Sequence, residues 1–302
     1  MRRIISLGVL SFPAWGSVQF IHQHGSPFNS ATRFAIEMFT DHDHERHFKA
    51  LFNTGASDCW LERGAMSPMS YRDYETRESI GAGEKEEPSY TLVGGRLESV
   101  VPWAVRHQHH STFKHGAGHL AAGIDSAFSK DFGEFTISPR LNDDVTEFSL
   151  SVGPKDESVG WFDSPVVFDE TTKWIVDGSL EIIGISEIPV TLSLDTSLRG
   201  ISLPSEIYTQ YVSALESLGI STSKILEALM AETSCDHVPS IWVTIGDVRT
   251  ELAVGESLRE EGSCMVWVQE NVKGAYIEVG EIFFAKHAVH FDSLKRIVSI
   301  AV

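Results

Sequence analysis

Two short apolar segments of this sequence each end in an asparagine or aspartate followed by threonine. They are Ala50-Leu51-Phe52-Asn53-Thr54 and Leu192-Ser193-Leu194-Asp195-Thr196. The Asp195 carboxylate can accept and donate a proton, as a general acid or base must. The Asn53 amide keeps the size and hydrogen-bonding groups of a carboxylate but cannot take up a proton. Two small-residue turns, at 120–124 and 276–280, each follow one of these segments, and this order predicts a duplicated structure.

Histidines gather in two stretches, and they are the other side chains here that could do chemistry. The pattern His-x-His on a strand places two imidazoles on one face, where they could hold Zn²⁺ if a third ligand converged. No cysteine or glutamate stands at a recognised metal-binding spacing, so we expect these histidines in surface loops and edge strands and predict no metal and no other cofactor. A histidine that serves as a general base in a cleft is an alternative. The stretches contain His42, His44 and His47, and then His107, His109, His110, His115 and His119.

The first segment continues over 52–61 as Phe-Asn-Thr-Gly-Ala-Ser-Asp-Cys-Trp-Leu. This stretch resembles the Asp-Thr-Gly-Ser/Ala-Ser-x-x-Trp-Val segment of the pepsin-like aspartic proteases, with asparagine in place of the aspartate. The stretch 194–204 is similar to that family's second Asp-Thr-Gly motif and to the Leu-Pro that opens the next helix. The stretch 279–292 resembles the family's Leu-Gly-Asp-Val-Phe-Leu…Val-Phe-Asp ending. These landmarks follow one another in the order that the family has.

The resemblance implies a mostly β, bilobal pepsin-like aspartic protease fold with a cleft between two β-rich lobes. We expect an N-terminal lobe at 1–165, which carries the Asn53 motif and the flap. We expect a C-terminal lobe at 166–302, which carries the Asp195 motif. The boundary lies in a segment that contains aspartate and proline.

In that family two aspartates, one from each lobe, share a proton while they act on a water molecule and on the scissile carbonyl. The resemblance makes Asn53 and Asp195 the two catalytic positions. Because an amide cannot cycle between acid and base, Asp195 would act alone, and losing a general acid–base partner typically costs about 10²–10⁴ in rate. Ser197 replaces a glycine of the second motif, and Leu198 stands where the family usually has a hydroxyl that orients the carboxylate.

The resemblance also implies which residues would bind a substrate or support the cleft. Thr54 and Gly55 belong to the first loop, and Thr196 and Ser197 belong to the second. In the family the two threonine hydroxyls interlock these loops. Tyr90 is our candidate for the tyrosine of a flap over the cleft; the alternative is an ordinary strand tyrosine, because the family's usual Tyr-Gly-x-Gly tip is absent.

The cysteines and the N-terminus bear on the compartment. Cys235 and Cys264 could pair, and they lie where the family has a disulfide in its last lobe. That pairing leaves Cys59 odd, which is weak support for a reducing compartment. The apolar run near the N-terminus could be a short signal peptide, but Pro13 and Trp15 interrupt it. We therefore expect a retained N-terminal strand and an intracellular protein.

The chain has 302 residues, of which 42% are hydrophobic and 22% charged, as is usual for a globular protein. Its net charge of −18 argues against nucleic acid or an anionic membrane surface as a partner. No apolar run reaches the ~20 residues of a membrane-spanning helix. We expect a monomer whose ligand is a small molecule or a peptide.

The elements that must position the two motifs are mostly strands. Short runs rich in β-branched and aromatic residues recur between turn residues, and 33–39, 147–152 and 241–245 alternate apolar and polar side chains as half-buried strands do. One helix is predicted at 205–218, where apolar residues recur at i, i+4, i+8 and i+11 from Ile207. A second short helix is predicted at 222–233.

Taken together, these features predict a pepsin-fold protein that has lost endopeptidase activity. Its cleft would bind a small hydrophobic molecule, and Asp195 would supply acid or base for a cyclisation or an isomerisation. A non-catalytic pseudoprotease that binds a peptide or a partner is one alternative. A true aspartic protease with an inactivating Asp-to-Asn change at position 53 is another, and the departures at Ser197 and Leu198 argue against it.

Overall fold

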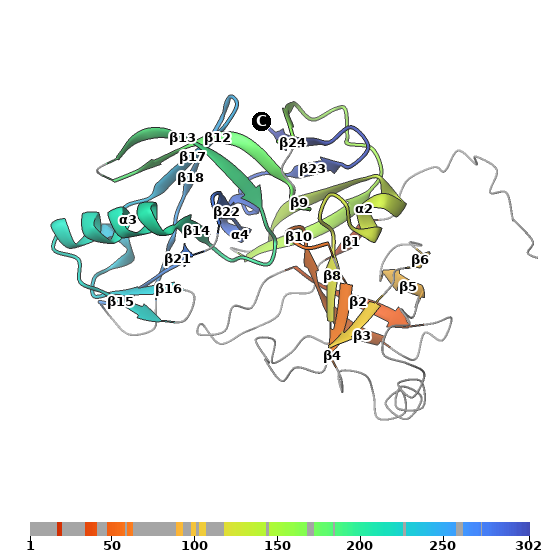
Figure 1. Cartoon of the computed structure of the whole chain (residues 1–302), viewed down its shortest axis with the longest axis horizontal. Helices are drawn as coiled ribbons and strands as arrows, with labels where there is room; N and C mark the ends of the chain where they lie inside the picture. Colours follow the sequence, from red (N-terminus) through yellow and green to blue (C-terminus); the bar gives the residue numbers. More distant parts are fainter. Residues whose placement is uncertain are drawn as a thin grey trace, which may run out of the picture.

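The computed structural model describes 17–19, 34–40, 47–57, 59–62, 89–92, 98–100, 103–106 and most of 118–302. Within that last part the gaps are 143–144, 168–171, 184, 226–227, 258–261 and 273. The described part of the chain is mostly β, with short helices between the strands (Figure 1). The described strands form four sheets.

The first seven-stranded sheet of the described residues holds Asn53, and its strand order is β6-β5-β2-β3-β8-β4-β7. Its central strand β3 runs parallel to β8, which in turn runs antiparallel to β4. The strands are β2 (Ala35–Thr40), β3 (His47–Asn53), β4 (Cys59–Glu62), β5 (Ser89–Leu92), β6 (Glu98–Val100), β7 (Trp103–Arg106) and β8 (Gly118–Ala121).

The second seven-stranded sheet of the described residues includes the strands on either side of Asp195 in the sequence. Its strand order is β18-β17-β12-β13-β22-β14-β21. Here β13 runs parallel to β22, and β22 runs antiparallel to β14. The strands are β12 (Ile175–Ile182), β13 (Ile185–Leu194), β14 (Ile201–Pro204), β17 (Ile241–Ile245), β18 (Val248–Leu252), β21 (Val268–Asn271) and β22 (Ile277–Val279).

The two seven-stranded sheets have the same topology. If β2, β3, β4 and β8 are matched with β12, β13, β14 and β22, the strand orders coincide from one edge to the other. The directions of pairing coincide as well, because β4·β7 and β14·β21 are both parallel, and β2·β5 and β12·β17 are both antiparallel. The duplication predicted from the sequence is therefore present in the described strands.

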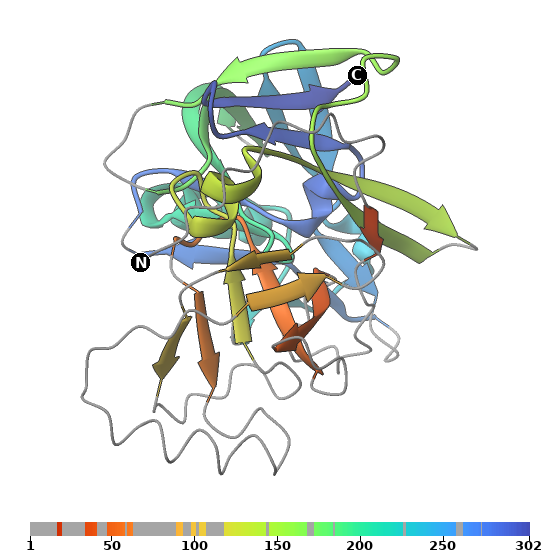
Figure 2. The same cartoon turned by 90° about the vertical axis from the view of Figure 1, so that its right-hand side faces the viewer.

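A six-stranded sheet joins the two halves of the sequence, in the order β1-β10-β9-β23-β24-β11 among the described strands (Figure 1 and Figure 2). At its centre β9 pairs antiparallel with β23, and the aromatic rings of Phe135 and Phe291 stack with centroids 4.8 Å apart. Outward from that pair, β10 corresponds to β24 and β1 to β11. The strands are β1 (Ser17–Gln19), β9 (Glu134–Asn142), β10 (Val145–Val152), β11 (Trp161–Pro165), β23 (Val289–Asp292) and β24 (Ile297–Ala301).

The helix predicted at 205–218 is present as α3 (Ser205–Ser217), which begins directly after Pro204. Tyr211 and Leu215 are buried as the periodicity predicts, whereas Leu218 lies past the last turn and is 53% exposed. Two shorter helices, α2 (Ala127–Phe132) and α4 (Glu281–Phe284), follow β8 and β22. Among the described residues, none of the helices is long and apolar enough to cross a membrane.

The prediction of a helix at 222–233 is wrong, because residues 222–225 and 228–231 form an antiparallel hairpin. Strand β15 (Thr222–Ile225) pairs with β16 (Ala228–Ala231), and β16 pairs with β20 (Cys264–Val266). Strand β19 (Gly255–Ser257) completes this sheet. The short apolar run of β16 is compatible with a helix or a strand. Its pairing with β20 selects the strand.

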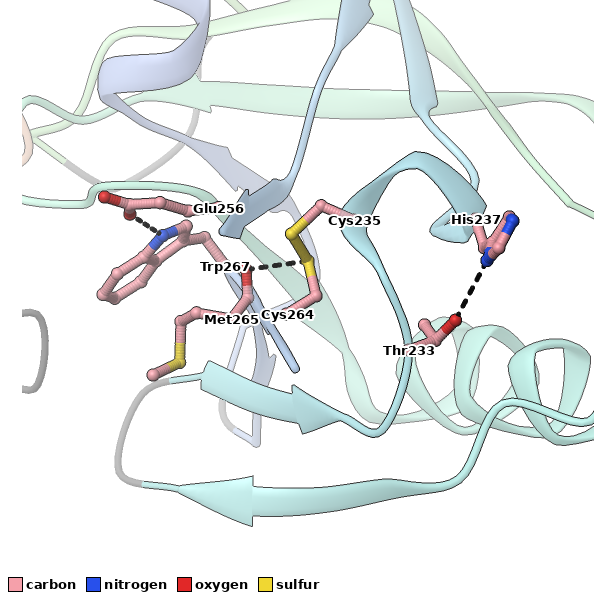
Figure 3. Close-up of a disulfide and its surroundings, with 7 residues drawn as sticks. All are labelled: Thr233, Cys235, His237, Glu256, Cys264, Met265 and Trp267. Atoms are coloured by element: carbon pink, nitrogen blue, oxygen red, sulfur yellow. Dashed lines mark hydrogen bonds between the residues drawn. A yellow bond between two sulfur atoms is a disulfide. The ribbon is translucent and has the colours of Figure 1, made fainter. Parts of the chain in front are cut away.

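A disulfide joins this sheet to the short helix η1 (Cys235–His237). Cys235 on η1 is bonded to Cys264 on β20, with Cα atoms 5.0 Å apart (Figure 3). Beside the bond, the Trp267 indole donates a hydrogen bond to the Glu256 carboxylate at 2.7 Å.

Candidate functional site

Asn53 and Asp195 occupy matching places in the two seven-stranded sheets. Asn53 is the last residue of β3, and Asp195 directly follows β13. The residues before them, Phe52 and Leu194, are fully buried and anchor each strand in the core. At both positions the chain leaves the sheet in a tight turn, and the backbone of Asp195 donates a hydrogen bond to the Val279 carbonyl of the neighbouring strand at 3.0 Å.

The threonines that follow them bind the two turns to each other. The Thr54 amide donates to Thr196 Oγ1 at 3.1 Å, and the Thr196 amide donates to Thr54 Oγ1 at 3.0 Å. Each hydroxyl then donates to the opposite strand, Thr54 to the Leu194 carbonyl at 2.7 Å and Thr196 to the Phe52 carbonyl at 2.6 Å. Both threonines are fully buried. In this structure they therefore position the two loops and leave no hydroxyl surface for a ligand.

The side chains of Asn53 and Asp195 meet at Gly55. The Gly55 amide donates to Asn53 Oδ1 at 2.6 Å. A Cβ atom placed on Gly55 would lie 2.0 Å from Asp195 Oδ2 and 2.4 Å from its Cγ, which only a glycine avoids. Asn53 and Asp195 are 8% and 7% exposed, so both residues are largely buried. The structure thus places together the two residues that the sequence singled out.

The Asp195 carboxylate is oriented by its own loop. Ser197 donates to Asp195 Oδ1 twice, from its amide at 2.9 Å and from its hydroxyl at 2.6 Å. The sequence comparison treated Ser197 as a lost glycine and Leu198 as a lost hydroxyl. The structure shows that the Ser197 hydroxyl orients the carboxylate from one position earlier. A hydroxyl therefore orients the Asp195 carboxylate, although Leu198 has none.

A charged pair lies next to Asp195, and the sequence analysis did not identify it. Lys173 forms an ion pair with Glu278, and its ammonium group lies 5.1 Å from the centre of the Tyr276 ring. Burial works against the charge on Lys173, but the hydrogen bond and charge of Glu278 outweigh it and raise the pKa of Lys173 above its ordinary range. The negative charge of Asp195 acts in the same direction. Lys173 is therefore a fixed cation beside the candidate site.

Ser193 lies beside this ion pair. It precedes Asp195 by two residues on β13, and its register partner on β22 is Glu278. Ser193 is fully buried, and its hydroxyl has no hydrogen-bond partner within the described residues. Buried hydroxyls usually have a hydrogen-bond partner, so Ser193 adds an unsatisfied polar group beside the Lys173–Glu278 ion pair.

Other predicted residues are placed only in part. Tyr90 lies on β5, where its backbone faces Thr40 of β2 and Ser99 of β6, and its side chain lies outside the described part of the structure. His47 and His119 lie on β3 and β8, and the other histidines of the two stretches fall outside the described residues. The division at 165/166 falls at the end of β11, which pairs with the C-terminal strand β24.

Comparison of the chain with models of known protein families and with curated proteins found no match.

Proposed function

We propose that this chain has the bilobal pepsin-like fold, has lost endopeptidase activity, and uses Asp195 for acid or base chemistry on a small hydrophobic molecule. The observation that carries this proposal is the meeting of Asn53 and Asp195 at Gly55, from equivalent turns of two topologically identical sheets. An amide thus occupies the position that a second carboxylate would need to fill.

The fold part of the proposal is supported by symmetry. Two seven-stranded sheets repeat one topology. In the six-stranded sheet, β9 from the first half of the chain pairs with β23 from the second half. The hydrogen bonds of Thr54 and Thr196 are reciprocal, as expected for two loops that occupy equivalent places in two related sheets. A lobe on each side of these loops would put Asn53 and Asp195 at the floor of a cleft.

The loss of proteolysis follows from the chemistry of the pair. Peptide hydrolysis by this kind of site needs one group that removes a proton from water and another that protonates or hydrogen-bonds the carbonyl, with the roles exchanged in the next step. Asn53 can donate or accept a hydrogen bond but cannot exchange a proton. The remaining carboxylate can serve in a reaction that needs one proton-transfer group.

The retained order around Asp195 supports a continuing role for it. Its Oδ1 is held by two donors from Ser197, while Oδ2 points to Gly55 on the opposite loop. A fixed carboxylate with one oxygen directed to the interface of the loops is suited to isomerisation or cyclisation, in which a single proton moves within one molecule.

The test compares the wild-type chain with Asn53→Asp, Asp195→Asn and, as a matched control, Asp177→Asn at an exposed position on β12. Each protein is incubated at acid pH with an unfolded protein and, separately, with a small-molecule extract of the source cells, followed by mass spectrometry. We expect no cleavage by the wild type or by Asn53→Asp, and a conversion that Asp195→Asn abolishes and Asp177→Asn retains. Cleavage by either of the first two proteins, or a conversion that survives in Asp195→Asn, would contradict the proposal.

A pseudoprotease that binds a peptide without chemistry is the second candidate. The intact threonine interlock favours it, because it preserves the position of both loops without needing a proton-transfer pair. In the same experiment this candidate predicts no cleavage and no converted molecule. Its own test is the binding of an unfolded polypeptide, measured by calorimetry, which should be the same for the wild type and Asp195→Asn.

A further inference from the structure

Three side chains that commonly bind metal ions converge on one face of the six-stranded sheet, away from Asn53 and Asp195. Glu134 lies on β9, and His290 and Asp292 lie on β23. In the register of these strands Asp292 is opposite Glu134, and His290 is opposite Thr136. Because side chains two residues apart share a face, all of these groups point to the same side of the sheet. The aromatic residues between them, Phe135 and Phe291, face the core.

The distances between the donor atoms suit a bound cation. One ligand atom from each of Glu134, His290 and Asp292 lies within 4.8 Å of the other two. His290 Nε2 is 3.5 Å from Glu134 Oε2, which is too long for a good hydrogen bond. Two ligand atoms that each lie about 2.1 Å from a tetrahedral Zn²⁺ are themselves about 3.4 Å apart. The observed separation of 3.5 Å is close to the edge length of such a shell.

The second ring nitrogen of His290 is held as it is in metal sites. His290 Nδ1 is 2.9 Å from the Thr136 hydroxyl, a residue outside the trio. A ligating imidazole commonly hydrogen-bonds through its other nitrogen, which fixes the ring and directs the lone pair at the ion. The His290 side chain is 2% exposed, so its ring cannot turn into solvent, and Nε2 stays directed at Glu134.

The competing cation is Lys295. Its amide donates to Asp292 Oδ1 at 2.8 Å, and its ammonium group donates to Asp292 Oδ2 at 2.7 Å. The Lys295 side chain is 67% exposed, whereas that of Asp292 is 4% exposed. Lys295 can therefore move its ammonium group into water and leave the carboxylate in place. The Asp292 oxygens keep lone pairs for an ion, because Lys295 donates only one hydrogen bond to each of them.

We propose that Glu134, His290 and Asp292 form a binding site for a divalent cation with zinc-like preference, in which a water molecule completes the coordination. One imidazole nitrogen and two carboxylate oxygens are a donor set that zinc and neighbouring transition metals accept. The ion would link β9 to β23, the two strands at which the halves of the sequence meet in the six-stranded sheet. This site is independent of the chemistry proposed for Asp195.

The experiment measures zinc binding to the chelator-treated full chain by isothermal titration calorimetry. Because other histidines of the chain can also bind zinc, the readout is the difference between Glu134→Gln and Glu216→Gln, the same change at an exposed position of α3. We expect Glu134→Gln to lose one equivalent of zinc or to weaken it at least tenfold, and Glu216→Gln to match the wild type. Thr136→Val should weaken the same equivalent about 10–100-fold through the lost support of His290.

Two further measurements separate this site from an ordinary Lys295–Asp292 ion pair. Lys295→Met removes the competing cation, so it should tighten the zinc equivalent that Glu134→Gln removes. Crystals of the wild type soaked in zinc should show an anomalous peak among the three side chains. Equal binding by Glu134→Gln and Glu216→Gln, or the absence of that peak, would overturn the proposal, and neither result depends on any variant's catalytic activity.

Discussion

Thr54 and Thr196, which are 142 residues apart in the sequence, each accept a hydrogen bond from the other's backbone amide. Each hydroxyl also donates to the strand that precedes the other threonine. The four bonds form a closed set that uses only buried groups, so the two loops are held in one relative position. The place of Asn53 relative to Asp195 depends on this set.

Replacing Thr196 by valine, which has nearly the same shape, should destabilise the protein. The change removes the acceptor of the buried Thr54 amide and a donor to the Phe52 carbonyl. An unsatisfied buried amide costs about 1–3 kcal/mol and a lost hydrogen bond about 0.5–1.5 kcal/mol, so we expect a loss of roughly 2–4 kcal/mol in the free energy of unfolding, measured in urea. Thr196→Ser keeps the hydroxyl and loses one buried methyl group, at about 1 kcal/mol. Equal stability of the two variants would contradict the assigned role.

Replacing Gly55 by alanine should displace the Asp195 carboxylate. The added Cβ would lie 2.0 Å from Asp195 Oδ2, so the carboxylate or the loop must move. We expect a loss of about 1–3 kcal/mol in the free energy of unfolding and, in a crystal structure of the variant, an Asp195 side chain rotated away from Gly55. The control is Gly160→Ala, whose Cβ would meet the Val302 side chain at an ordinary 3.6 Å. An unmoved Asp195 in Gly55→Ala would show that the loops have more freedom than we infer.

His290 should make the metal-free protein less stable as the pH falls. Burial, helped by the charges of Lys155 and Lys295 and opposed by those of Asp292 and Asp163, lowers the pKa of His290 from 6.5 to about 4. The unfolded chain therefore binds a proton that the folded chain does not bind between about pH 6.5 and pH 4. The stability contributed by the neutral ring is complete above pH 6.5 and is lost on acidification, by roughly 3 kcal/mol at most.

Urea unfolding of the wild type and of His290→Gln in the presence of a chelator measures this effect, because only the wild type carries the titrating ring. The difference between their free energies of unfolding should shrink or reverse in sign from pH 7 to pH 4.5. A constant difference over that range would rule out the lowered pKa of His290.

The disulfide between Cys235 and Cys264 should stabilise the small sheet formed by β15, β16, β19 and β20. It closes a loop across a sequence separation of 29 residues, and bonds of this kind contribute about 2–4 kcal/mol. A reducing agent should lower the unfolding temperature of the wild type. The double variant Cys235→Ala with Cys264→Ala should unfold near that lower temperature and should not respond to the reducing agent. A response of the double variant would place the sensitive bond elsewhere.

The segment 222–231 and Ser197 show why some features could not be predicted from sequence. Four-residue apolar patterns fit a helix or a strand, and β16 became a strand because β20, more than 30 residues later, offers it hydrogen bonds and a buried face. Ser197 looked like a simple loss, because its effect depends on where its hydroxyl lies relative to the Asp195 carboxylate. In both cases the deciding contact is made in three dimensions.

The mostly β character, the helix α3, the repeated motif and turn, and the matching of an amide position with an acid position follow from the sequence alone. These properties are written in local periodicity and in residue type, which act over a few neighbouring residues. The fold brings Asn53 and Asp195 together at Gly55, sets the Lys173–Glu278 ion pair beside Asp195, and puts Glu134, His290 and Asp292 on one face. These relations depend on strand register and on contacts between segments more than 100 residues apart, which no local pattern specifies.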